Sequence, residues 1–159
     1  MVDSLPVAMA ASLIVLAAIA SLAGLGLSRA QPMVSTASVD GQLSTLSNDC
    51  GALLASSPRD LLDPASPPGA SKTMTLSLPQ DTAYVSFGSD QSEGSIVYEV
   101  HGNRKAIALG SVKLREGVEK GGVMVPSKAH RVIEGGGRYE ITIEYEYDRS
   151  LDEKYLIVY

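Results

Sequence analysis

The sequence predicts an α+β protein in which a long N-terminal helix, transmembrane and then amphipathic, is followed by a small antiparallel β-sandwich-like head. Three observations predict this fold class: an apolar run without charge at 5–27, apolar side chains at helical spacing over 39–53, and alternating apolar and polar side chains beyond residue 72. We therefore expect a transmembrane helix at 1–30, an amphipathic helix or stalk at 31–56, a Pro/Ser-rich linker at 57–71 and a β-rich head domain at 72–159.

The apolar run at 5–27 is long enough to cross a bilayer. As a helix it would span roughly 34 Å, against a hydrocarbon core of about 30 Å. A secretory signal cleaved after Ala30 is an alternative, but no Lys or Arg precedes the run and its apolar core exceeds the usual length of such signals. The sequence therefore favours a helix that is retained, with the lipid bilayer as one partner.

The same run is rich in small residues. Alanine, serine and glycine let helices approach closely, so copies of this helix would pack densely side by side. Two alternatives therefore remain for this helix: a plain membrane anchor surrounded by lipid, or a filament helix surrounded by copies of itself. The residues that we expect to carry insertion or assembly are Leu13, Ile14, Leu16, Ile19, Leu22 and Gly24.

An amphipathic helix is expected after Pro32, where the missing backbone donor predicts a kink or break. Five apolar residues follow at spacings of four, three, four and three, which places them on one helical face. This stalk packing face consists of Val39, Leu43, Leu46, Cys50 and Leu53. It has two possible targets, the protein's own β domain or neighbouring subunits.

The head begins with strands that alternate around Met74, Leu76 and Leu78 and then at 83–87. Between 95–101 and 104–109, Gly102 and Asn103 predict a tight hairpin turn. A strand at 112–115 is expected to break over 116–122, and short strands are expected at 123–125 and 129–133. Seven to nine such strands indicate a sandwich or a strongly curved sheet.

The last predicted hairpin has the clearest alternation. From Tyr139 to Tyr147 one face is aromatic and aliphatic, and the other carries Glu140, Glu144 and Glu146. Alternate carboxylates on a strand lie in a line rather than around a point, so we interpret this acidic row as a solvent face, with cation binding as the alternative. Residues 154–159 form the final strand.

The charge and the reactive side chains exclude several classes of function. The net charge of −5 argues against nucleic acid as a partner. Cys50 is the only cysteine, so no intramolecular disulfide is possible, and with His101 and His130 it gives no zinc-binding spacing. No nucleophile motif and no phosphate-binding glycine loop is present. We therefore predict no catalytic residues, no cofactor and no metal site, and a protein that is not an enzyme.

The order of an apolar helix with an early Pro6, an amphipathic continuation and a small β domain resembles the type IV pilin-like superfamily, with archaeal pilins and archaellins as the most similar in style. In that family a basic leader is removed and the apolar stretch is retained; no such leader precedes Leu5 here. The resemblance implies a surface filament, an extracytoplasmic head and self-association, or association with other pilin-like subunits, through the N-terminal helix.

We therefore expect a membrane-anchored structural protein, a pilin-like subunit or minor pilin that assembles through residues 13–24. The alternative is a single-pass binding module, in which the helix only anchors a β head that recognises a ligand or a partner protein.

Overall fold

The computed structural model describes residues 4–159, with side chains described for 12–24 and 33–159. The chain divides into two compact units, Met1–Ser35 and Thr36–Tyr159. Helix α1 (Ser4–Leu54) supplies the described part of the first unit and the N-terminal element of the second. It continues without interruption through Pro32, so the break predicted there is wrong.

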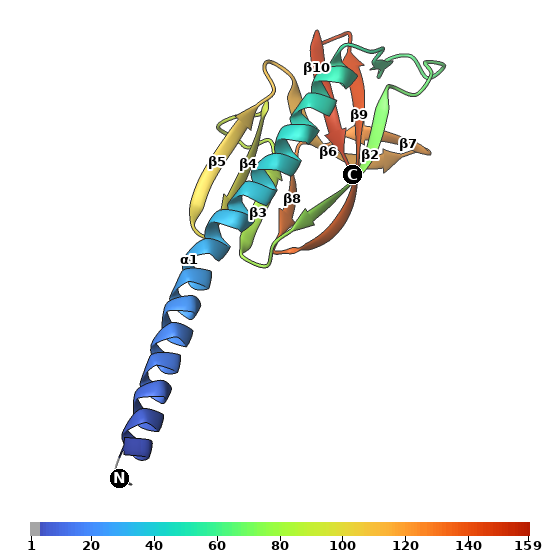
Figure 1. The fold of residues 1–159 in the computed structure, drawn as a ribbon. Coiled ribbons are helices and arrows are strands. Elements are labelled where there is room, and N and C mark those ends of the chain that lie inside the picture. The colour runs from blue at the N-terminus through green and yellow to red at the C-terminus, as the bar shows by residue number, and fades with distance from the viewer. Residues whose placement is uncertain (1–3) are drawn as a thin grey trace. The chain divides into compact units, whose positions relative to one another are not determined.

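The second unit contains two sheets (Figure 1). The six-stranded sheet has the order β1-β9-β10-β6-β7, and β2 also pairs with β9. Its strands are β1 (Arg59–Asp60), β2 (Ser71–Leu78), β6 (Lys113–Lys120), β7 (Val123–Pro126), β9 (Gly137–Asp148) and β10 (Glu153–Val158). This sheet is mixed, because β6 runs parallel to β10 and β1 runs parallel to β9.

The four-stranded sheet is antiparallel and has the order β5-β4-β3-β8. Its strands are β3 (Thr82–Phe87), β4 (Ser95–Val100), β5 (Asn103–Ala108) and β8 (Arg131–Glu134). The hairpin between β4 and β5 turns at His101 and Gly102, whose φ angles are 51° and 73°. Two positive φ angles are the requirement of a type I′ turn, so the turn lies one residue earlier than predicted.

Strand β6 is longer than its sequence predicts, because Gly117 lies inside it. A Cβ at this position would lie 2.9 Å from the Tyr159 ring, so the glycine here permits close packing and does not end the strand. The turn falls instead at Gly121 and Gly122, with φ angles of 64° and 82°. The predicted break over 116–122 is therefore wrong.

One core joins the helix and both sheets. Val39, Leu43, Leu46 and Cys50 are fully buried, and Leu53 is 8% exposed. They pack in a single cluster with side chains of both sheets, including Phe87, Ile96, Ile141, Ile143 and Leu156. The stripe on the helix thus meets the protein's own β strands.

Polar contacts fix the helix to one strand edge of each sheet. Toward the four-stranded sheet, the Asp40 carboxylate accepts hydrogen bonds from the Tyr98 hydroxyl at 2.7 Å and from Lys105 Nζ at 2.5 Å. Burial alone would raise the pKa of Asp40, but these two hydrogen bonds outweigh it and hold the pKa below its ordinary value. The helix therefore contacts β4 and β5 through an ionised carboxylate.

Toward β2, the Gln42 amide pairs with the backbone of Ser77. Its Nε2 donates to the Ser77 carbonyl at 2.8 Å, and its Oε1 accepts from the Ser77 N–H at 2.8 Å. An ion pair of 2.6 Å joins Lys72 to Asp49 along the same strand. The helical turns from Asp40 to Asp49 therefore lie between β2 of one sheet and β5 of the other, in front of the strands in Figure 1.

The predicted fold class is wrong in its balance and in its helix. Of residues 12–24 and 33–159, whose side chains are described, 44% lie in strands and 25% in helix, so this part of the protein is mostly β. The segment 57–71, predicted as a linker, contributes β1 and the start of β2. The helical residues from Thr36 onward belong to the same unit as the sheets.

Among the described residues, no helix combines the length and the apolar character needed to cross a membrane. The predicted transmembrane helix at 1–30, and the membrane and pilin-like descriptions that depend on it, are corrected by this finding and by the β-rich fold. Residues 1–3 of that range lie outside the described residues, as do the side chains of 4–11 and 25–30.

Replacing Leu46 should destabilise the second unit strongly. We expect Leu46→Ala to lower the free energy of unfolding by about 2–5 kcal/mol, because it leaves a cavity between the helix and the sheets. Urea unfolding followed by circular dichroism measures the change. The exposed Ser44→Ala on the same helix is the control and should be nearly neutral. Equal effects of the two substitutions would contradict the packing described above.

Gln42→Glu should break the pairing with β2. A carboxylate still accepts from the Ser77 N–H but cannot donate to the Ser77 carbonyl, so two oxygens face each other. We expect a loss of about 1–3 kcal/mol in thermal or urea unfolding. Gln80→Glu changes the net charge equally at an exposed turn position and should cost far less. A neutral Gln42→Glu would show that this amide does not hold the helix.

Candidate functional site

Three features of the described residues are candidates for function: the apolar surface of α1 at 12–24, a polar hollow between loops, and two buried carboxylates on β9. The composition of the sequence predicted the apolar surface as a candidate. Nothing in the sequence indicated the polar hollow, and the carboxylates of β9 were predicted to lie on a solvent face.

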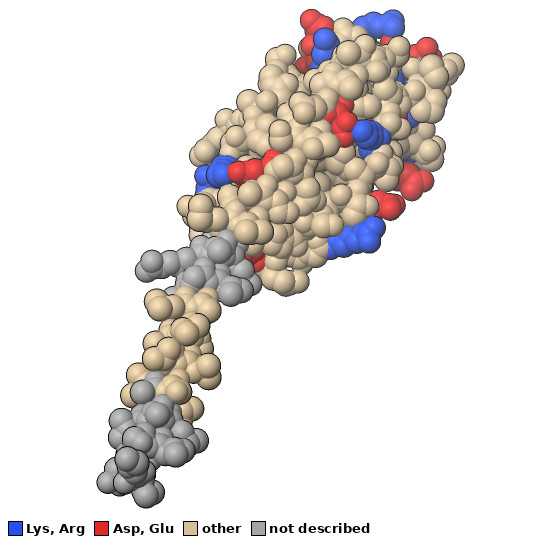
Figure 2. All heavy atoms as spheres, in the orientation of Figure 1, with Lys and Arg blue, Asp and Glu red and all other residues tan. Residues whose placement is uncertain are grey.

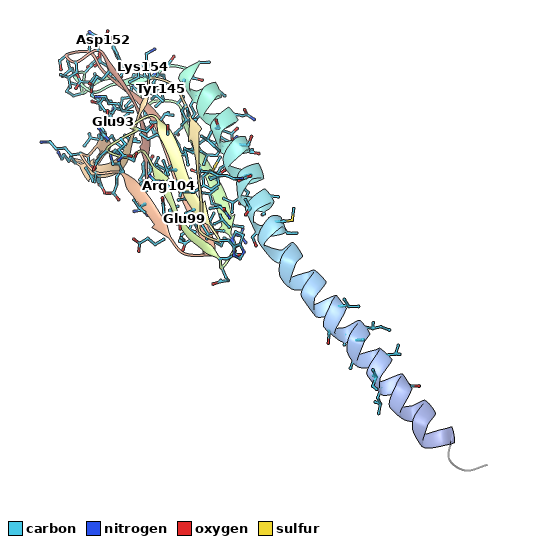
Figure 3. All side chains as sticks on the ribbon, turned by 90° about the vertical axis from the view of Figure 1, so that its left-hand side faces the viewer. Glu93, Glu99, Arg104, Tyr145, Asp152 and Lys154 are labelled. Carbon is cyan, nitrogen blue, oxygen red and sulfur yellow. The ribbon has the colours of Figure 1, made fainter. Side chains whose placement is uncertain are left out.

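The first candidate is the apolar surface of residues 12–24. The predicted assembly residues Leu13, Ile14, Leu16, Ile19 and Leu22 are 60–70% exposed, and Gly24 has no side-chain or distant backbone atom within 4 Å of an added Cβ. Figure 2 shows this stretch without charged atoms, and in Figure 3 its side chains project from several sides of the helix. An apolar helix surface that is this exposed, as it is within the described residues, is typical of an interaction element.

The predicted stalk packing face lies elsewhere. All five of its residues, Val39, Leu43, Leu46, Cys50 and Leu53, are buried in the core of the second unit. Burial raises the pKa of the Cys50 thiol to about 12, so the thiol stays protonated and unreactive at neutral pH. These residues are therefore unavailable to a neighbouring subunit.

The second candidate is a hollow of about 510 Å³ beside β6. It is lined by Asp90, Glu93, Arg115, Pro126, Ser127, Lys128, His130, Asp148 and Tyr155. The loops at 88–94 and 126–130 approach β6 here, because the Leu114 N–H donates to the Glu93 carbonyl at 2.8 Å and the Glu116 N–H to the Ala129 carbonyl at 2.9 Å.

Several of the charges around this hollow are paired with one another. Arg115 donates to the Glu93 carboxylate, and this bond holds the pKa of Glu93 below its ordinary value. Its other terminal nitrogen lies 3.1 Å and 3.2 Å from the two ring nitrogens of His130, and Asp90 lies 3.4 Å from His130 Nε2. Arg115 therefore has little remaining capacity for an anionic ligand.

Lys113 extends the same network. Its Nζ donates to Glu153 Oε1 at 2.5 Å and lies 3.4 Å from Glu93 Oε2, and the hydrogen bond from Lys113 lowers the pKa of Glu153. Burial and a hydrogen bond to Glu153 raise the pKa of the Tyr155 hydroxyl to about 12. The result is a balanced set of ion pairs rather than a field of one sign.

The serine and the histidine that line the hollow are bonded to backbone carbonyl groups. Ser127 Oγ donates to the Ala129 carbonyl at 3.4 Å and is not bonded to His130. His130 Nδ1 lies 3.3 Å from the Leu114 carbonyl. Within the described residues, no group of three or more His, Cys, Asp or Glu side chains has a metal-binding arrangement.

The third candidate corrects the interpretation of the acidic row. Glu140 is exposed as predicted for a solvent face, but Glu144 is 7% exposed and Glu146 is fully buried. The Glu144 carboxylate accepts from the Gly69 N–H at 3.1 Å and from the Tyr159 hydroxyl at 3.2 Å. Within the described residues, neither oxygen of Glu146 has a hydrogen-bond partner.

The environment of Glu146 favours its protonated form. Burial in the first place, and the nearby Glu144 carboxylate in the second, raise its pKa to about 8, although Arg59 acts in the opposite direction. Arg59 is the register partner of Glu146 in the pairing of β1 with β9, and its Nε is also buried without a partner. A carboxyl group in this state is neutral at pH 7.

Comparisons with protein-family models, with curated proteins and with solved structures find no significant match for this chain. The fold and the three candidate features therefore carry the functional argument on their own. Together they describe a β-rich domain with an integral helix and an exposed apolar helical surface.

The ion pair in the hollow predicts a measurable pKa change. In Arg115→Met the pKa of Glu93 should rise toward its ordinary value, because its main hydrogen-bond donor is lost. Carboxyl ¹³C NMR titration reports this directly. Lys128→Met removes a cation from the same hollow that is not paired with Glu93 in the structure, and should shift the pKa of Glu93 much less. Equal shifts would show a general field effect instead of a specific pair.

Proposed function

We propose that this protein is a structural subunit that associates with further copies of itself through residues 12–24 of α1. The single observation that carries the proposal is the exposure of every large apolar side chain in this stretch, between 57% and 70%. The β-rich unit is then the folded body of each subunit.

The energy available for association is large. Fully burying a Leu, Ile or Val side chain contributes about 1.5–3 kcal/mol, and six such side chains lie between Leu13 and Leu22. The entropy lost on association offsets part of this gain. No charged side chain in this stretch adds a desolvation cost to that loss.

The directions in which these side chains project favour an assembly of more than two copies of the helix. Leu13, Ile14 and Val15 follow one another at about 100° around the helix axis, so together they cover most of its circumference. One partner helix buries only one face. Small residues in the same stretch, such as Ala17, Ala20 and Ala23, permit the close approach that a bundle of several helices requires.

The second candidate function is a ligand-binding module, which the hollow beside β6 favours. Its volume of about 510 Å³ is in the range of small-molecule sites. We place it second because the ion pairs of Arg115, Glu93 and Lys113 already satisfy the charged groups that would recognise a ligand.

Leu16→Glu combined with Ile19→Glu should abolish self-association. We expect the full chain to sediment as an oligomer at micromolar concentration, and the double variant to sediment as a monomer with an unchanged unfolding midpoint of the β-rich unit. Both side chains project from the helix into solvent, so their replacement removes binding surface and leaves the core intact.

The matched control is Leu62→Glu combined with Leu151→Glu, which places the same charges at exposed apolar positions of the second unit. This control should remain oligomeric. A monomeric native chain at these concentrations would overturn the proposal. So would a chain that stays monomeric in buffer and floats with phosphatidylcholine vesicles, because the occupant of the helix surface would then be lipid.

A further inference from the structure

Residues 57–70, which we call the strap, are held on β9 mainly by backbone pairing near residues 59–61 and 69–70. The Leu61 N–H donates to the Tyr147 carbonyl at 3.0 Å, and the Tyr145 N–H donates to the Ala70 carbonyl at 2.9 Å. Of the whole strap only Gly69 is buried. A segment with so little buried apolar surface opens at low free-energy cost.

The strap contacts the Glu144 carboxylate and pairs through its backbone with Glu146. Gly69 donates its N–H to Glu144, and an added Cβ on this glycine would lie 2.0 Å from the Tyr145 carbonyl, so the backbones touch. Arg59 of the strap is the register partner of Glu146. The ion pair of 2.5 Å between Asp60 and Arg149 lies at the same end of β9.

Each titratable or charged group that faces Glu146 can be named. Glu144 comes from its own strand, Arg59 from the strap, and the phenol groups of Tyr155 and Tyr159 from β10 and the residue after it. Tyr155 bonds to Glu153 and Tyr159 bonds to Glu144, so neither hydroxyl is directed to Glu146. Arg59 is thus the only cation among these groups.

We propose that Glu146 and the strap form a pH-sensitive latch, in which the protonated carboxyl keeps the strap closed and its ionisation releases it. On ionisation the proton leaves to solvent, and the carboxylate remains beside Glu144 without a hydrogen-bond donor. Opening of the strap brings water to both carboxylates and removes the penalty of the buried charge. This inference does not depend on self-association of α1.

The pH range follows from the two forms. In the open form Glu146 ionises in the ordinary carboxyl range, whereas in the closed form it ionises near pH 8. The free energy that favours the closed form is therefore largest below the ordinary carboxyl pKa range. It falls as the pH rises toward 8, and it is constant above that pH. The equilibrium constant for opening of the strap increases tenfold for each pH unit in which Glu146 is ionised only in the open form.

Hydrogen exchange tests the latch in the full chain. We expect the protection factors of peptides covering 57–70, corrected for the intrinsic pH dependence of exchange, to fall by at least about tenfold between pH 5.5 and 8.5. Glu146→Gln should hold them nearly constant, because the amide cannot ionise. Glu140→Gln, an exposed change on the same strand, should behave as the native chain does.

Two results would overturn the latch: constant strap protection in the native chain, or an equal fall in Glu146→Gln. If that variant does not fold, carboxyl ¹³C titration of the native protein decides. The proposal would be rejected if the Glu146 signal titrates at the same pH as the signal of the exposed Glu140. It would be supported if the titration midpoint of Glu146 lies well above that of Glu140 and strap protection is lost over the same pH range.

Discussion

The structure depends on the burial of one helical stripe against two sheets. The edges at β2 and β5 do not pair with each other, so the apolar side chains between the sheets need a cover on this side. Val39, Leu43 and Leu46 supply it with no exposed area. The contacts of Asp40, Gln42 and Asp49 then set the position of the helix along the strands. Hydrophobic burial supplies the free energy, and the polar contacts select one register among those that the stripe would allow.

The middle of strand β9 is buried on both of its faces. This strand is central in the six-stranded sheet and packs its Ile141, Ile143 and Tyr145 side chains against the core. Its opposite face carries Glu144 and Glu146, and both carboxylates are buried. The segment before β2 is not a free linker here, because residues 59–60 pair with β9 as a short parallel strand. A carboxylate placed for solvent thus becomes a buried group whose charge opposes the packing around it.

Helix α1 carries two apolar surfaces with different roles. From Thr36 onward, apolar side chains occupy one face and are buried in the chain's own core. Over 12–24 they occupy the circumference and remain exposed. In the function that we propose, the first surface makes the subunit and the second joins subunits. The polar hollow has no comparable role, because Arg115 and Glu93 bond to each other and leave a balanced set of charges.

The sequence by itself determined the local elements. The four-three spacing from Val39 to Leu53 identified the helical face, and the alternation at Met74–Leu78 and Tyr139–Tyr147 coincides with β2 and β9, because periodicity is a property of neighbouring residues. Only the tertiary structure decided what each face meets. The burial of Glu146, the strand in the Pro/Ser-rich segment, the parallel pairing of β6 with β10 and the hollow beside β6 all arise from residues distant in the chain. Contacts of that kind leave no period in the sequence, so the acidic row appeared to be a solvent face until its cover was known.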